Sequence, residues 1–332
     1  MTHTFTGKPP IIIAHRGASG YRPEHTLAAY ELAIALGADF IEPDLVSTKD
    51  GVLIARHENE ISETTDVASR GEFAHRQTTK IIDGESKSGW FTEDFTLAEL
   101  KTLRAIERIP EMRSHNTAYN GRWEIPTLQE IIDLVQGKSA QINRTIGIYP
   151  ETKHPTYFKS LGLSLEPPLL ATLTANGYQG ANAPVFIQSF EVSNLQELSQ
   201  TTDLPLVQLL NEHGLPYDFV VSGNHRTYAD LAATSGLKEI AKYAQAVGVN
   251  KNLVVKRDSL GKLLSPTSLV TDAHAAGLLV HLWTFRNEDS FLPLDFQGNP
   301  QGEYQLFFNL GIDGVFSDYP DTAVAVCSST GS

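Results

Sequence analysis

Three acidic residues are placed where they could bind a metal ion. Glu42 and Asp44 lie two positions apart in an extended apolar run, so their side chains are expected on one face of a strand. Glu151 directly follows another apolar run. Carboxylates that approach one another in a partly buried site need protons or a cation to offset their repulsion. Because oxygen ligands suit Ca²⁺ or Mg²⁺ better than Zn²⁺, we predict one such divalent ion here; the alternative is a pair of ion-paired surface acids.

Two of the eleven histidines differ from the others in their position. His15 and His57 each end an apolar run and each stands beside a charged residue, Arg16 or Glu58. Histidine donates or accepts a proton near neutral pH, so a pair of histidines could supply both an acid and a base. His25 follows an acid at the start of a predicted helix, and there we expect it to pack or to cap.

Positive charge lies beside the predicted metal ligands. Arg16 and Lys153 could bind an anionic substrate, such as a phosphoryl group, with a forked contact from the guanidinium and a point charge from the ammonium. They could equally serve only as ion-pair partners of the local acids. Trp283 could line an apolar or glycerol-sized pocket, although a tryptophan inside a barrel more often belongs to the core.

Repeated strand and helix patterns would position these residues. Short apolar runs alternate with helical patterns, which is typical of βα units around a parallel sheet. The helices include one over 25–36 that ends at Gly37 and one from Thr127 to 134, where Glu130 completes a capping box. The predicted fold is a TIM (β/α)8 barrel, of class α/β, with strands at 11–14, 39–46, 144–149, 185–187, 206–210, 252–255, 278–283 and 314–316.

The candidate residues fall at one end of these strands. TIM barrels carry their active sites at the carboxyl ends of the strands, so the side chains there are expected to converge. A polar, irregular segment at 59–123, with one helix predicted over 97–103, follows the second βα region and indicates an insertion. Since no long Gly/Ser-rich or Pro-rich linker divides the chain, we predict a single domain over 1–332. The residues at strand ends are His15, Glu42, Asp44, Glu151, Gln188 and Trp283.

The composition excludes several other kinds of protein. The 332-residue chain has 41% hydrophobic and 20% charged residues, which is ordinary for a globular protein, and its formal charge of −13 argues against a nucleic-acid partner. A single cysteine, Cys327, excludes an intrachain disulfide and a thiolate metal site. No apolar run approaches the about 20 residues of a membrane helix, and no secretion signal precedes residue 11. The sequence as written therefore predicts a cytoplasmic protein, or a periplasmic or secreted one if a signal has been removed.

Ten ordered blocks of sequence resemble the glycerophosphodiester phosphodiesterase family. They extend along nearly the whole chain, and the insertion together with the block at Gly89 makes the longer, periplasmic type of bacterial enzyme the closer likeness. The blocks are HRGASGYRPEHT from His15, EPDLVSTKDG from Glu42, ARHE from Ala55, ISETTDV from Ile61, GWFTEDFTLAELKTLR from Gly89, IPTLQEIIDL from Ile125, ETK from Glu151, FIQSF from Phe186, LWTFRNE from Leu282 and GIDGVFSDYPDTAV from Gly311.

This resemblance implies a metal-dependent TIM barrel that hydrolyses small glycerophosphodiesters, such as glycerophosphocholine and glycerophosphoethanolamine, to sn-glycerol 3-phosphate and an alcohol. Two departures concern the backbone: Pro43 separates the two acids, and Tyr149-Pro150 precedes Glu151. Pro43 has no N–H, so one ladder hydrogen bond should be lost there. The implied roles are acid and base for His15 and His57, metal ligands for Glu42, Asp44 and Glu151, phosphate contacts for Arg16 and Lys153, and outer substrate contacts for Glu24, Gln188 and Trp283.

The mechanism expected from these roles has two versions. The nucleophile is either the substrate's own glycerol hydroxyl or a metal-activated water; one histidine takes its proton and the other protonates the leaving alkoxide. Two other functions stay open at this stage: a phospholipase D-like lyase on the same barrel, resembling the sphingomyelinase D toxins, and a non-catalytic phosphodiester-binding protein.

Overall fold

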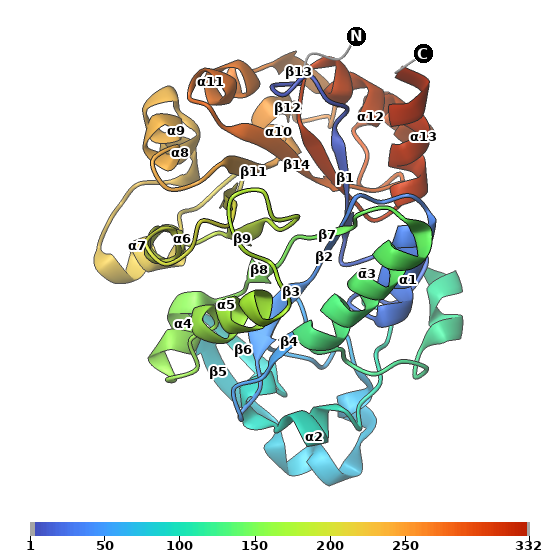
Figure 1. The fold of residues 1–332 in the computed structure, drawn as a ribbon. Helices are drawn as coiled ribbons and strands as arrows, with labels where there is room; N and C mark the ends of the chain where they lie inside the picture. Colours follow the sequence, from blue (N-terminus) through green and yellow to red (C-terminus); the bar gives the residue numbers. More distant parts are fainter. Residues whose placement is uncertain (1–3, 331–332) are drawn as a thin grey trace.

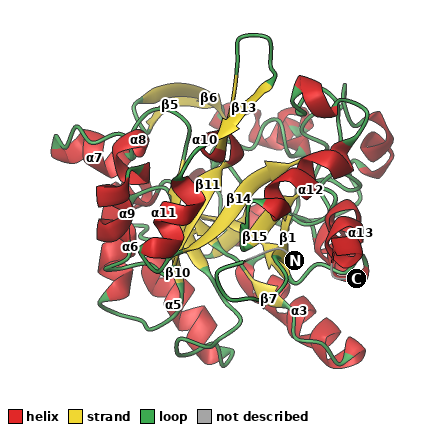
Figure 2. Ribbon diagram, turned by 90° about the horizontal axis from the view of Figure 1, so that it is seen from above, coloured by secondary structure: helices red, strands yellow, loops and turns green. Residues whose placement is uncertain are grey.

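A ring of parallel strands forms the centre of the computed structural model, which describes residues 4–330 (Figures 1 and 2). The first strand, β1 (Ile11–His15), pairs with the last, β15 (Gly314–Ser317), and with β2 (Phe40–Glu42), and these pairings close the ring. This closure confirms the expected barrel. The remaining barrel strands are β3 (Asp44–Ser47), β7 (Gly147–Ile148), β8 (Glu151–Thr152), β9 (Ile187–Ser189), β10 (Leu206–Leu210), β11 (Ala246–Asn250) and β14 (Leu279–Phe285).

Two prolines interrupt neighbouring strands of the ring. Pro43 separates β2 from β3, and Pro150 lies between β7 and β8, because proline has no N–H to donate to the ladder. The carbonyl groups of both prolines still accept hydrogen bonds from the next strand, at 2.9 Å from the nitrogens of Glu151 and Gln188. Each interrupted pair therefore acts as one barrel strand, and the ring has eight strand positions within residues 4–330.

Helices surround the ring (Figure 2). The capping box predicted at Thr127 and Glu130 is present at the start of α3, and this helix runs further than expected, to Ile142. Helix α1 begins later than expected, at Leu27, with Thr26 as its N-cap. The helices are α1 (Leu27–Ala35), α2 (Leu97–Leu100), α3 (Leu128–Ile142), α4 (Pro155–Ser160), α5 (Glu166–Ala175), α6 (Val192–Ser199), α7 (Tyr217–Ser222), α8 (Tyr228–Ala232), α9 (Thr234–Ile240), α10 (Lys251–Val254), α11 (Leu269–Ala275), α12 (Pro300–Asn309) and α13 (Pro320–Thr330).

The sixth barrel strand lies elsewhere than the sequence predicted. We expected it at 252–255, but the strand is β11 (Ala246–Asn250), and α10 occupies most of the predicted range. The side chain of Asn250 accepts a hydrogen bond from Asn252 N and starts that short helix. Gly248 made β11 a weak sequence signal, yet a Cβ atom there would lie 2.5 Å from Leu209 Cδ2, so glycine fits the close packing of β10 against β11.

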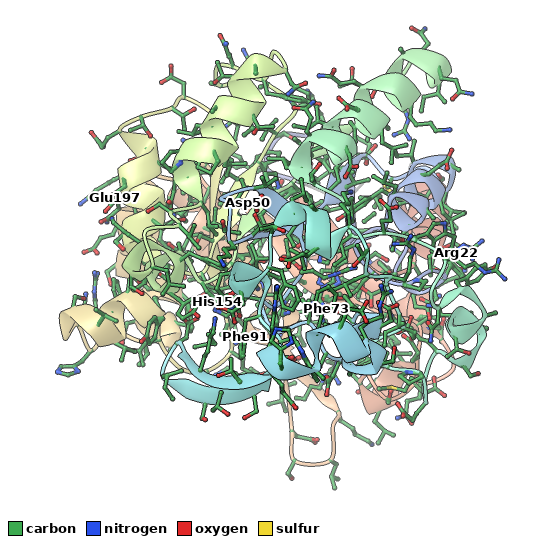
Figure 3. All side chains as sticks on the ribbon, turned by 90° about the horizontal axis from the view of Figure 1, so that it is seen from below. Arg22, Asp50, Phe73, Phe91, His154 and Glu197 are labelled. Atoms are coloured by element: carbon green, nitrogen blue, oxygen red, sulfur yellow. The ribbon has the colours of Figure 1, made fainter. Side chains whose placement is uncertain are left out.

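The segment at 59–123 lies outside the ring and contains a hairpin, β5 (Thr78–Ile82) and β6 (Glu85–Gly89). The helix predicted over 97–103 is shorter and ends at Leu100. Phe73 belongs to the same buried cluster as the barrel residue Val46. Figure 3 shows the segment from below, with Phe73 and Phe91 labelled. Short 3₁₀ helices cover Asp66–Ser69, Gly71–Arg76, Thr92–Asp94, Ser114–Tyr119 and, elsewhere in the chain, Leu294–Phe296.

Two further strand pairs lie beside the ring. Strand β4 (Leu53–Ala55) runs antiparallel to β3 and leads into the inserted segment. Strands β12 (Val255–Arg257) and β13 (Leu263–Pro266) form a hairpin next to α10. Among the helices within residues 4–330, none is long and apolar enough to cross a lipid bilayer.

Candidate active site

The inner face of the barrel continues into a set of polar side chains at the carboxyl ends of the strands. A small buried cluster that includes Ile13, Tyr149 and Phe316 fills the ring, with Phe40 and Phe186 packed against it. Side chains two positions apart on a strand share a face. The residues two positions after these apolar ones therefore lie above the cluster; they are His15, Glu42, Glu151, Gln188 and Asp318.

Three buried carboxylates meet on this face. One oxygen from each of Glu42, Asp44 and Glu151 lies within 4.8 Å of the others. Strand register brings them together, because Asp44 pairs with Glu151 across β3 and β8. Glu42 and Asp44, two positions apart, point to the same face because the chain keeps its direction through Pro43, which lies between them.

Neighbouring groups hold each of the three carboxylates. Glu42 accepts hydrogen bonds from the backbone N of Arg16 at 2.8 Å and from Gln188 Nε2 at 2.9 Å. Asp44 Oδ2 lies 2.9 Å from the Nε2 atom of the fully buried His25. Lys153 Nζ donates to Glu151 Oε1 at 2.8 Å. His25 thus packs, as expected, but it packs against a predicted metal ligand.

The electrostatics of this cluster favour a cation. Burial, together with the charges of Asp44 and Glu151, raises the pKa of Glu42 well above its usual value. Burial also raises the pKa of Glu151 to about 8, against the opposing effect of Lys153. Asp44 Oδ1 is buried and has no hydrogen-bond partner among the described residues. A donor set made only of oxygens, one of them unpartnered, fits a hard divalent ion such as Ca²⁺ or Mg²⁺.

His15 is fixed by a carboxylate from the far end of the chain. Its Nδ1 atom lies 2.6 Å from Asp318 Oδ1, and both side chains are buried. Burial and the positive charge of Arg16 lower the pKa of His15 to about 4, although Asp318 opposes this shift. The contact leaves the Nε2 atom of the ring for other partners.

His57 has a similar arrangement in the loop after β4. Its Nδ1 atom bonds to Glu58, whose other oxygen lies 2.6 Å from Arg108 Nη2. Burial and the nearby charges of Arg16 and Lys153 lower the pKa of His57 below its usual value. Both predicted proton-transfer residues are therefore oriented through Nδ1 by a carboxylate.

Arg16 is held beside the carboxylate cluster by Glu24. Its Nη1 atom donates to Glu24 Oε2 at 3.0 Å, while its Nε atom lies 3.5 Å from Asp44 Oδ2 and has no hydrogen-bond partner among the described residues. Glu24 does not line the central cavity, so it supports Arg16 and not the cavity wall. Arg16 has a φ angle of 59°, an uncommon conformation for a side-chain-bearing residue.

A cavity of about 340 Å³ opens over these groups. Trp283 lines it, with its indole Nε1 donating to Gly248 O at 3.0 Å and its ring packed edge to face on Phe190. Lys153 lines the two neighbouring cavities instead. The predicted site residues that line the central cavity are His15, Arg16, Glu42, His57, Glu151, Gln188 and Trp283.

Sequence reasoning missed several charged residues around the site. Asp318 directly follows β15, so its strand-end position could have marked it as it marked Glu151. Arg286 follows β14 in the same way, and its Nε atom donates to Asp318 Oδ2 at 2.9 Å. Arg108 and Arg113 lie in the inserted segment, where no periodic pattern pointed to the barrel.

The comparisons with known proteins agree with this geometry. The model of the "Glycerophosphoryl diester phosphodiesterase family" matches residues 15–322, which include every predicted site residue. The chain belongs to this family. A glycerophosphodiester phosphodiesterase of Arabidopsis thaliana is 38% identical over 323 residues, covering 93% of this chain and 84% of that protein. One of Haemophilus influenzae is 31% identical and covers 98% and 91%. The expected family and its enzyme class, phosphoric diester hydrolase, are thereby confirmed.

Solved structures of glycerophosphodiester phosphodiesterase relatives share the fold. A structure from Silicibacter pomeroyi, described as a putative glycerophosphoryl diester phosphodiesterase, has a TM-score of 0.68 at 21% identity and covers 98% of this chain and 95% of its own. A phosphodiesterase of Oleispira antarctica, solved in complex with the product sn-glycerol-3-phosphate, has a TM-score of 0.64 at 21% identity, with coverages of 98% and 100%. These likenesses concern the fold.

Proposed function

We propose that this chain hydrolyses glycerophosphodiesters, such as glycerophosphocholine and glycerophosphoethanolamine, to sn-glycerol 3-phosphate and an alcohol. The observation that supports this most is one cavity lined by two carboxylate-held histidines and by Glu42 and Glu151, two of the three clustered carboxylates. The names of the Arabidopsis and Haemophilus relatives and the product bound to the Oleispira phosphodiesterase support the same substrate class.

The proposed cofactor is one divalent ion, Ca²⁺ or Mg²⁺. Glu42, Asp44 and Glu151 would hold it, since they supply oxygen ligands within 4.8 Å of one another. When bound, such an ion supplies positive charge that holds a phosphodiester oxygen and offsets charge built up on phosphorus.

The positive side chains beside the cluster would bind the phosphodiester. Arg16 retains an Nε–H without a hydrogen-bond partner among the described residues, so it can donate to a phosphoryl oxygen. Lys153, directly after β8, is buried against Glu151 and contributes a point charge there. Gln188 orients Glu42, and Trp283 supplies an apolar wall for the glycerol moiety.

The two histidines would move the protons. A carboxylate on Nδ1 fixes the tautomer that leaves Nε2 as the reacting nitrogen, and it stabilises the imidazolium form. One histidine takes the proton of the nucleophile, either the substrate's glycerol hydroxyl or water, while the other donates a proton to the leaving alkoxide. Asp318 serves His15 in this way, and Glu58 serves His57.

A turnover assay with metal-reconstituted protein tests the proposal. The protein is incubated with each of a panel of glycerophosphodiesters in the presence of Ca²⁺ or Mg²⁺, and the released sn-glycerol 3-phosphate is measured. We expect release that stops on chelation. Turnover of sphingomyelin with no glycerophosphodiester hydrolysis would instead favour the lyase, and no turnover of any substrate would favour a binding protein. A substrate that lacks the glycerol hydroxyl next to the phosphodiester distinguishes the two possible nucleophiles. If it is hydrolysed as fast as glycerophosphocholine, attack by the substrate's own hydroxyl is excluded and water is the nucleophile.

A further inference from the structure

One part of the inserted segment reaches back to the barrel mouth. Arg108 and Arg113, five positions apart, extend from it toward the carboxyl ends of the barrel strands. With Arg16, Glu24 and Asp318 they line a second, smaller cavity of about 100 Å³. The inserted segment therefore contributes charged groups to the surroundings of the catalytic centre.

Arg108 bridges two carboxylates that hold site residues. Its Nε and Nη2 atoms form a fork on Glu24 at 2.9 and 2.5 Å, and Nη2 also lies 2.6 Å from Glu58 Oε2. Glu24 holds Arg16, and the other oxygen of Glu58 holds His57. Arg108 is thus linked to His57 and to Arg16, each through one carboxylate.

Arg113 makes the corresponding contact with the carboxylate that holds His15. Its Nη2 atom lies 2.5 Å from Asp318 Oδ2, and Asp318 Oδ1 holds His15 at 2.6 Å. Its remaining nitrogens are fixed as well, with Nε donating to Glu288 at 2.6 Å and Nη1 to Ser19 O at 2.9 Å. Its side chain is only 5% exposed, so little freedom is left to the guanidinium or to the carboxylate it binds.

We propose that Arg108 and Arg113 are positioning residues for the two proton-transfer histidines, and that the inserted segment thereby completes the catalytic centre. Each carboxylate gives one oxygen to a histidine and the other to arginine: Glu58 Oε2 contacts Arg108, and Asp318 Oδ2 accepts from Arg113 and also from Arg286. The arginine fixes the carboxylate's rotamer and keeps it ionised, so the histidine keeps its reacting tautomer and direction. This inference rests on the proposed function.

A purely structural role for the arginines makes a different prediction. If they only attach the insertion to the barrel, their loss lowers activity equally for every substrate. If they position an acid and a base, the loss depends on the leaving group, because a good leaving group needs no protonation by the acid. Two esters of glycerol phosphate, with choline and with 4-nitrophenol as the leaving group, distinguish the two roles.

The test uses R108Q and R113Q, with R76Q as the matched control. Arg76 forms an ion pair with Glu99 inside the same insertion, away from the barrel mouth. We expect kcat on the choline ester to fall roughly 10- to 100-fold in R108Q and R113Q, by analogy with the loss of outer partners at metal sites. KM should rise only in R108Q, since only Arg108 also holds Glu24 and hence Arg16. R76Q should keep the wild-type kcat.

With the nitrophenyl ester, one variant should regain most of its lost kcat and the other should not. The variant that regains it identifies the histidine that acts as acid. Equal losses on both esters in both variants, or no loss in either, would overturn the proposal. Absence of turnover of both esters by the wild type would instead be a failure of the proposed function. Retained binding of Ca²⁺ or Mg²⁺ by R108Q and R113Q confirms that the variants fold.

Discussion

The carboxyl groups of the metal cluster are buried and close together, so the protein alone does not stabilise a negative charge on all three. They belong to Glu42, Asp44 and Glu151. Burial raises the pKa of Glu151 to about 8 and also raises that of Glu42, whereas Lys153 and His25 keep the pKa of Asp44 low against the effect of burial. In the absence of a cation, protons therefore occupy part of the cluster. A divalent ion competes with these protons for the same oxygens.

The first prediction concerns Glu151 as a proposed metal ligand. E151Q keeps the size of the side chain but removes one of the three negative charges, so divalent-metal affinity should fall at least about tenfold. Isothermal titration calorimetry with Ca²⁺ and Mg²⁺ measures the change. E191Q is the matched control, because Glu191 is also buried and also has a raised pKa, about 8, but lies outside the cluster. Equal metal affinity of E151Q and wild type would contradict the assignment of Glu151 as a ligand.

The sequence located residues whose position follows from strand periodicity. Glu42 and Asp44 share a face because they are two apart, and Glu151 lies opposite them because parallel strands end at one rim. Contacts between distant segments gave no such signal. Arg113 meets Asp318 across 205 positions, and nothing local to either residue indicates the other.

At the scale of elements, the loop between β1 and α1 begins at Arg16 and directly follows His15, the last residue of β1. Gly17 has a φ angle of 88°, and a Cβ atom there would lie 2.8 Å from Ala29 Cβ. Gly51 has a similar φ of 78°, but a Cβ atom there would meet nothing within 4 Å. An alanine at Gly51 would therefore suffer backbone strain alone, whereas an alanine at Gly17 would suffer both backbone strain and steric overlap.

The second prediction uses this pair. G17A and G51A should each lose about 1–2 kcal/mol of stability from left-handed strain. Only G17A should lose more, since overlap in a packed site costs a further 1–3 kcal/mol or so. Because the overlap displaces the loop, kcat should fall in G17A alone. Chemical denaturation and steady-state kinetics measure both effects; wild-type kcat in G17A would contradict the role given to this loop.

Elements with a strong pattern were predicted well, and the others were not. Apolar runs identified seven of the eight strand positions, whereas β11 was missed because Gly248 and Asn250 weaken its pattern. The prediction of a strand over 252–255 was wrong, since the side chain of Asn250 starts a helix there. The hairpin β5–β6 was missed as well, because its strands are mostly exposed and polar.

At the scale of the whole molecule, metal binding and folding should be linked. Glu151 has an ordinary pKa of 4.5 when unfolded and about 8 in the folded protein without metal. A carboxyl with a raised folded pKa adds stability that is complete below the lower value and is lost as the pH rises through the higher one. His15 and His57 have a lowered pKa, so their contribution to stability rises with pH up to their ordinary value of 6.5 and opposes that of Glu151 below it. Stability in chelator should therefore decrease from pH 6.5 to about 8.

The third prediction follows from this linkage. A cation that binds the ionised cluster stabilises the folded state, by about 2.7 kcal/mol at a hundred times its Kd. The rise in Tm on adding Ca²⁺ or Mg²⁺ should be larger near pH 8 than near pH 6, because fewer protons compete. Differential scanning calorimetry across this range measures it, and E151Q should show a much smaller rise. A rise that is largest at the lower pH would contradict the linkage.

The most direct test of the account is a paired measurement on H15A. His15 lies beside the carboxylate cluster but supplies none of its ligands, so H15A should bind Ca²⁺ or Mg²⁺ like the wild type. Its release of sn-glycerol 3-phosphate from glycerophosphocholine should fall by at least about 100-fold, the usual contribution of a general acid or base. Unchanged turnover at saturating metal would contradict the assignment of proton transfer to His15 and, with it, the proposed catalytic centre.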